Sequence, residues 1–156
     1  ERGVFPTKRW IKIAATGLGA GYAPFAPGTV GTIVGIPLYL ALSSLSRPFH
    51  LLAILVLTGL AIWISQKAEV LFQKKDSPRI VIDEIIGLQY TLALAAPTLL
   101  HVISGFLLFR FFDIVKVFPA RTAQDRLPGG YGVVADDVVA GIYGAALLRL
   151  LTGLWG

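Results

Sequence analysis

The chain has 156 residues, of which 55% are hydrophobic and only 15% are charged, and it carries a net charge of +5. Because soluble domains contain about 25% charged residues, this composition argues against an ordinary soluble protein. The lack of cysteine excludes disulfide bonds, thiolate nucleophiles and cysteine metal sites. The basic residues are interleaved with apolar runs rather than gathered on one polar face, so we expect anionic lipid, and no nucleic acid, as a partner.

A basic segment, residues 1–13, opens the chain and leads into a glycine-rich stretch at 16–32. This stretch lacks the Gly-Lys-Ser/Thr ending of a P-loop and the third glycine of a dinucleotide fingerprint. We interpret the glycines of 17–21 as sites of close helix packing. At Gly28 and Thr29, two interpretations stay open, namely packing and the binding of a phosphate by N–H groups at a helix start.

Apolar runs make up most of the remaining chain. About 20 helical residues cross a hydrocarbon core, with about 17 as a lower limit. The first, second and fifth runs come near this length, and the third and fourth reach it only with their polar ends. A soluble helical core is the alternative for runs this short, but we predict an all-α membrane bundle of about five helices. It would form one domain over residues 1–156, with its apolar runs at 29–46, 50–66, 85–97, 99–112 and 138–155.

The charges of the loops predict how such a bundle is oriented. If five helices alternate, one side of the membrane holds residues 1–28, 66–84 and 110–137. That side carries twelve of the fourteen Lys and Arg residues and all nine acidic ones. The positive-inside rule makes this side cytoplasmic. Every acidic residue can therefore meet at one interfacial site on the cytoplasmic face.

Two acidic pairs lie beside apolar runs, where ionisable groups are functional candidates. We expect Asp83 and Glu84 to open the third helix, and Asp136 and Asp137 to open the fifth. Acidic residues in a first turn can cap free N–H groups and face the positive end of the helix dipole. Since a cap needs only one side chain, the second acid of each pair requires another explanation. Binding of Mg²⁺ through carboxylates and a substrate phosphate would provide it.

The end of the fourth helix combines both signs of charge. Arg110, Asp113 and Lys116 follow one another at intervals of three, so neighbouring members share a helix face. They form either local ion pairs with an interfacial anchor, or a phosphate clamp of Arg110 and Lys116 around a metal-binding or proton-transferring Asp113. His50 and His101 fall toward the other side of the membrane, and no Gly-x-Ser-x-Gly motif is present. Metal-assisted chemistry is therefore the mechanism that we expect.

Four groups of motifs follow one another along the chain and together cover roughly residues 14–145. They read ATGLG at 15–19 with APGTVGT at 26–32, IDEIIG at 82–87, GFLLFRFFDIVK at 105–116, and GYGVVADDVVAG at 130–141. In this order they resemble the bacterial phosphatidylglycerophosphatase A family.

This resemblance implies a magnesium-dependent lipid phosphatase of the bacterial inner membrane, with several membrane-spanning helices and its site facing the cytoplasm. It would hydrolyse the terminal phosphate of phosphatidylglycerophosphate to give phosphatidylglycerol, either by direct attack of water or through an aspartyl-phosphate. The alternatives are a non-catalytic protein that binds or moves anionic lipid, and a structural helix bundle. The implied catalytic residues are Asp83, Glu84, Asp113, Asp136 and Asp137, with Asp83, Glu84, Asp136 and Asp137 as metal ligands and Arg110, Lys116, Gly28 and Thr29 on the phosphate.

Overall fold

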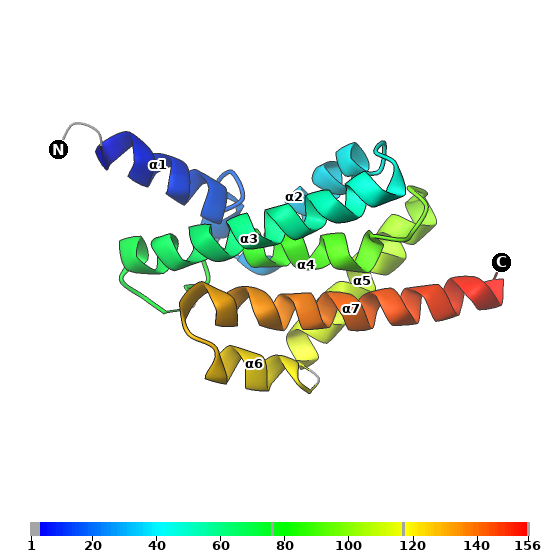
Figure 1. Ribbon diagram of the computed structural model, residues 1–156. Coiled ribbons are helices and arrows are strands. Elements are labelled where there is room, and N and C mark those ends of the chain that lie inside the picture. The colour runs from blue at the N-terminus through cyan, green and yellow to red at the C-terminus, as the bar shows by residue number, and fades with distance from the viewer. Residues whose placement is uncertain (1–3, 76, 117, 156) are drawn as a thin grey trace.

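The computed structural model describes residues 4–75, 77–116 and 118–155. Within these ranges every regular element is a helix, so the predicted all-α class is confirmed. Two long helices run lengthwise through the molecule with a shorter one between them, and the first helix and the end of the last one lie at opposite ends (Figure 1). In chain order the elements are α1 (Val4–Ala15), the 3₁₀ turn η1 (Ala20–Tyr22), α2 (Pro27–Leu42), α3 (Arg47–Phe72), α4 (Ile82–Leu92), α5 (Leu99–Val115), α6 (Ala120–Arg126) and α7 (Gly129–Trp155).

Helix α3 is the element with the clearest membrane character. Among the described residues it is the one helix that is long and apolar enough to cross a membrane, with 26 residues and a mean hydropathy of 2.0 over an 18-residue stretch. At 1.5 Å per residue, it is roughly 39 Å long. Its outer surface exposes Leu52, Leu55, Val56 and Trp63, a surface that suits lipid better than water. The crossing of a membrane by further helices stays a prediction.

Helix α4 occupies the centre of the bundle and contacts α2, α3, α5 and α7. Its approach to α7 depends on two glycines. A Cβ atom on Gly141 would lie 2.4 Å from the carbonyl oxygen of Gly87, and one on Gly87 would lie 2.8 Å from the carbonyl oxygen of Asp137. Both distances are too short for any side chain, so the two helix backbones meet directly. This close crossing brings the polar start of α4 against α7.

The last part of the chain differs from expectation in two ways. The segment 119–132, whose Pro128-Gly129-Gly130 predicts a turn-rich loop, contains α6, and α7 begins at Gly129 instead of at Asp136. The turn signal was misleading because Gly130 serves packing. A Cβ on Gly130 would lie 2.2 Å from the carbonyl oxygen of Ile62, so this start of α7 is pressed against α3.

Candidate active site

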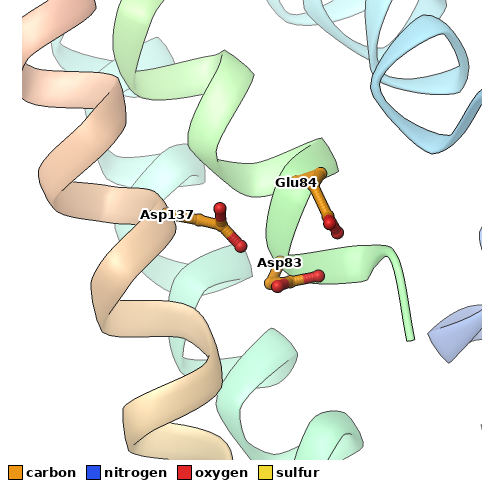
Figure 2. Close-up of side chains that lie close together, drawn as sticks. All are labelled: Asp83, Glu84 and Asp137. Carbon is orange, nitrogen blue, oxygen red and sulfur yellow. The ribbon is translucent and has the colours of Figure 1, made fainter. Parts of the chain in front are cut away.

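The acidic side chains from three helices gather into two groups that share one member. Asp83, Glu84 and Asp137 form the first group, and Asp113, Asp136 and Asp137 form the second. In each group, ligand oxygens from all three residues lie within 4.8 Å of one another. Figure 2 shows Asp137 directed from α7 toward the first turn of α4, where Asp83 and Glu84 project. All five acids expected at one site are therefore brought together.

These carboxylates are buried, which is costly for a charged group. Asp83, Asp136 and Asp137 are exposed by only 6%, 5% and 1%. One oxygen each of Glu84, Asp136 and Asp137 is buried with no hydrogen-bond partner among the described residues. Buried polar atoms nearly always have partners, and buried charges are paired or bound to metal. The orphaned oxygens thus fit a divalent cation, whose preferred ligands are carboxylates.

Burial also shifts the protonation of the cluster, whose members precede the apolar parts of α4 and α7. Burial raises the pKa of the Glu84 and Asp137 carboxyls well above their ordinary values, and the negative charges of Asp83 and Asp113 add to both shifts. Burial likewise raises the pKa of Asp136 to about 7, against the opposing charge of a lysine beside it. A bound cation would favour the ionised forms of these groups.

Helix capping does not account for the acidic pairs. Asp83 and Glu84 do lie in the first turn of α4, as expected, but the N-cap position of that helix is Val81 and makes no side-chain cap. Asp136 and Asp137 lie well inside α7, so the expectation that they open a helix is wrong. The early start of α7 against α3 moves them away from the free N–H groups of its first turn.

Two basic side chains border the carboxylates. Arg110 forms an ion pair with Asp113, as their spacing on α5 predicted. Lys116, which ends α5 in a left-handed conformation, places its Nζ atom 2.5 Å from Oδ2 of Asp136 on α7. Burial lowers the pKa of Lys116, but the hydrogen bond and charge of Asp136 outweigh this, and the net pKa is raised. The contact between Lys116 and α7 was not foreseen, because sequence spacing suggested only Asp113 as its neighbour.

The start of α2 lies against the same cluster. A Cβ atom on Gly28 would lie 3.0 Å from Oε1 of Glu84 and 3.3 Å from Nη1 of Arg110. The backbone of Gly28 therefore approaches both an acidic and a basic side chain of the site. The N–H of Thr29 donates to the carbonyl of Ala26 at 3.1 Å, so its hydroxyl is the group left for a ligand. Close packing and ligand binding, left as alternatives at this helix start, are compatible in the structure.

One set of contacts that positions Lys116 was not predicted from the sequence. The hydroxyl of Tyr143 on α7 donates to the carbonyl of Phe118 at 2.6 Å, and its ring stacks on Phe112 of α5 at a centroid distance of 5.4 Å. These contacts hold the residues on both sides of Lys116 against α7. A tyrosine among apolar helix residues carries no signal of such a role, because its partner is a backbone carbonyl.

Comparisons with known proteins agree with the motifs. The model of the family described as Phosphatidylglycerophosphatase A matches residues 13–152. A protein of Bacteroides thetaiotaomicron named "Putative phosphatidylinositol-3-phosphatase" is 39% identical over 147 residues, which cover 88% of this chain and 91% of the relative. Proteins named Phosphatidylglycerophosphatase A are 33% identical in Escherichia coli (92% of this chain, 84% of the relative) and 38% identical in Haemophilus influenzae (85% and 83%). No solved structure matches the chain.

Proposed function

The chain belongs to the phosphatidylglycerophosphatase A family and is a phosphatase, and from this premise we propose its substrate, its cofactor and its place in the cell. We propose that it hydrolyses the terminal phosphomonoester of phosphatidylglycerophosphate to phosphatidylglycerol and phosphate. The family model and the names of two relatives support this substrate. A third relative is named for a phosphate on a different lipid headgroup, so a phosphatidylinositol 3-phosphate substrate is the comparison to include in the assay.

The observation that carries the proposal is the pair of carboxylate groups that share Asp137. We propose that Asp83, Glu84, Asp136 and Asp137 hold one or two Mg²⁺ ions and that Asp113 completes the ligand shell or acts as a base. When bound, the cation would polarise the phosphoryl group and make water a better nucleophile at neutral pH. The buried oxygens that lack partners support a cation at this place.

The basic side chains would bind the phosphate itself. Arg110 can contact two phosphate oxygens at once, whereas Lys116 acts as a mobile point charge. In the structure both are ion-paired with acids of the cluster, so they are already held at its edge. The Gly28 backbone and the Thr29 hydroxyl would orient the same group from α2.

In the proposed reaction, the oxygen of a water molecule attacks phosphorus while the bond from phosphorus to the glycerol oxygen breaks. The proton released by water passes to a carboxylate, and the departing glycerol oxygen takes up a proton. Asp113, which has a carboxylate oxygen within 4.8 Å of oxygens of Asp136 and Asp137, would accept this proton as the proposed base. Trapping of a phosphorylated aspartate would favour the aspartyl-phosphate route instead.

The proposed location is the bacterial cytoplasmic membrane, crossed several times, with the acidic cluster at the cytoplasmic face. Its support is the length and apolarity of α3 and the concentration of basic residues in the loops assigned to that side. A site at this level would receive a lipid headgroup from the inner leaflet while the acyl chains stay in the bilayer.

Phosphate release from purified protein in mixed micelles tests the proposal. We expect release from phosphatidylglycerophosphate with Mg²⁺, loss of release in EDTA, and recovery when Mg²⁺ is restored. The phosphatidylinositol 3-phosphate arm decides between the two lipid substrates. Lipid binding without phosphate release in any arm would identify the non-catalytic alternative and refute the proposal.

A further inference from the structure

A basic pocket of about 780 Å³ lies on the face of α1 next to the one that packs on the bundle. Lys8, Arg9 and Lys12 line it along α1, and Thr16 and Tyr22 line its other end. No acidic side chain lines it in the described part of the chain. Figure 1 shows that α1 projects away from the helix bundle, so this pocket opens at the periphery of the molecule. Its charge selects an anionic ligand.

Aromatic side chains give this pocket a fixed rim. The guanidinium of Arg79 lies 5.6 Å from the ring centroid of Tyr22 and 5.7 Å from that of Phe72, and the two rings meet edge to face at 6.4 Å. The ammonium group of Lys12 lies 5.8 Å from the same Phe72 ring. Cations over aromatic faces are held in place, so part of the positive charge is oriented before any ligand binds.

An apolar groove of about 390 Å³ adjoins this pocket. It runs between α2, α3 and α4, where Leu38, Leu57 and Ile85 are among its lining side chains. The exposed side chain of Leu18 lines both the basic pocket and the groove. The two cavities are therefore adjacent, and together they offer positive charge at one end and a largely apolar surface at the other.

The basic pocket and the adjoining groove are separate from the carboxylate cluster. Ile82 and Ile85 are three residues apart on α4 and line the groove from one face of that helix. Glu84 projects from a different face, toward Gly28 and Arg110. A molecule in the groove would thus lie across α4 from the cluster, out of reach of its oxygens.

We infer that the basic pocket and the adjoining groove bind one anionic phospholipid, in addition to the substrate. Its headgroup phosphate contacts Lys8, Arg9 and Lys12, which suit phosphate oxygens, and one acyl chain lies in the groove. A soluble anion would satisfy the charges but leave the groove empty, whereas a phospholipid complements both surfaces. The exposed Trp10 on α1 and Tyr22 in the pocket lining are residue types that favour the membrane interface.

Native mass spectrometry of detergent-purified protein with added phosphatidylglycerol or phosphatidylcholine tests this inference. The pocket variant replaces Lys8, Arg9 and Lys12 with glutamine. The control variant replaces the exposed Lys67, Lys74 and Lys75 and so loses the same charge elsewhere. We expect the pocket variant to lose phosphatidylglycerol affinity by about tenfold or more, and the control variant to keep it. Equal affinity in the two variants would overturn the inference.

A second variant, Leu38→Phe, separates the groove from the headgroup pocket and does not alter charge. It should weaken binding of long-chain phosphatidylglycerol but leave a short-chain form unaffected. Displacement of the bound lipid by glycerol phosphate at similar concentrations would instead identify a pocket for soluble anions and refute the lipid site. Thermal unfolding of each variant checks that the fold is intact. None of these residues belongs to the carboxylate cluster, so phosphate release can be measured separately from lipid binding. A protein that releases no phosphate would refute the proposed function but would leave the lipid-binding result unchanged.

Discussion

The Nζ atom of Lys116 lies 2.5 Å from Oδ2 of Asp136, and this ion pair joins the end of α5 to α7. Earlier on α5, Arg110 forms an ion pair with Asp113. The side chains proposed to bind phosphate are therefore already in contact with those proposed to bind the cation. A ligand phosphate must compete with these carboxylates for the basic groups, and a cation would release the basic groups by taking over the carboxylates.

Asp137 is shared by both carboxylate groups, so its replacement should affect every cation position at once. We expect Asp137→Asn to lower phosphate release by at least about 100-fold, since even outer partners of metal ligands contribute 10- to 100-fold. The variant should also lose the stabilisation that Mg²⁺ gives to the wild type. Phosphate release and thermal unfolding with and without Mg²⁺ measure both effects. Asp125→Asn, at an exposed acid of α6, is the matched control and should behave as wild type.

The stability of the cation-free protein should fall as pH rises. The folded state holds the pKa of Asp136 at about 7, above its ordinary value of 3.8, and the pKa of Glu84 is also raised. At a pH below the pKa values of the unfolded chain, these carboxyls are protonated in both states, and their full contribution to the free energy of unfolding is present. As pH rises through about 7, the unfolded chain ionises more readily than the folded one, so stability is lost.

Unfolding midpoints recorded in EDTA from about pH 4 to about pH 8 measure this loss of stability. Added Mg²⁺ should make the loss smaller. Asp136→Asn should show a shallower decline than the wild type. A stability that rises over this pH range in EDTA would show that the carboxylates are stabilised in their ionised form without a cation.

Gly28→Ala should impair the reaction with little effect on the fold. The added methyl group would lie 3.0 Å from Oε1 of Glu84 and 3.3 Å from Nη1 of Arg110, so one of them must shift by a few tenths of an ångström. Small displacements of catalytic groups reduce rates by up to about 100-fold, and we expect a loss of kcat/KM of about tenfold or more. Gly59→Ala on α3, where a Cβ meets nothing within 4 Å, is the control. Equal kinetics for the two variants would contradict a role for the start of α2.

Gly141→Ala should destabilise the protein, because the methyl group would lie 2.4 Å from the carbonyl oxygen of Gly87. Overpacking of this kind costs about 1–3 kcal/mol, and forced separation of α4 from α7 should also weaken cation binding. Gly153→Ala, near the end of α7 with nothing within 4 Å, should leave both properties unchanged. Denaturant unfolding and Mg²⁺ titration measure the two effects, and an unaltered Gly141→Ala protein would show that the close crossing is dispensable.

Arg110→Lys tests whether the guanidinium binds phosphate through two oxygens. A charged hydrogen bond is worth about 1.5–3 kcal/mol, so loss of one should reduce kcat/KM roughly 10- to 100-fold although the charge is kept. Arg149→Lys, at an exposed position of α7, is the matched control. If Arg110 served only to pair with Asp113, lysine would replace it with little change in rate.

The local properties of this protein followed from its sequence. The apolar runs predicted helices, the spacing of Arg110 and Asp113 predicted their contact, and the motifs predicted the family. Each of these depends on residues near one another in the chain, where helical periodicity alone fixes which side chains are neighbours.

The pairing between distant segments was decided only by the tertiary structure. Spacing could not show that Asp137 belongs to both carboxylate groups, or that Lys116 reaches α7. These relationships depend on how closely α4 and α7 cross, which two glycines on different helices determine together. The sequence by itself thus determined which residues carry charge beside apolar helices. The tertiary structure decided which of them share a site, because contacts between helices depend on packing that no single segment encodes.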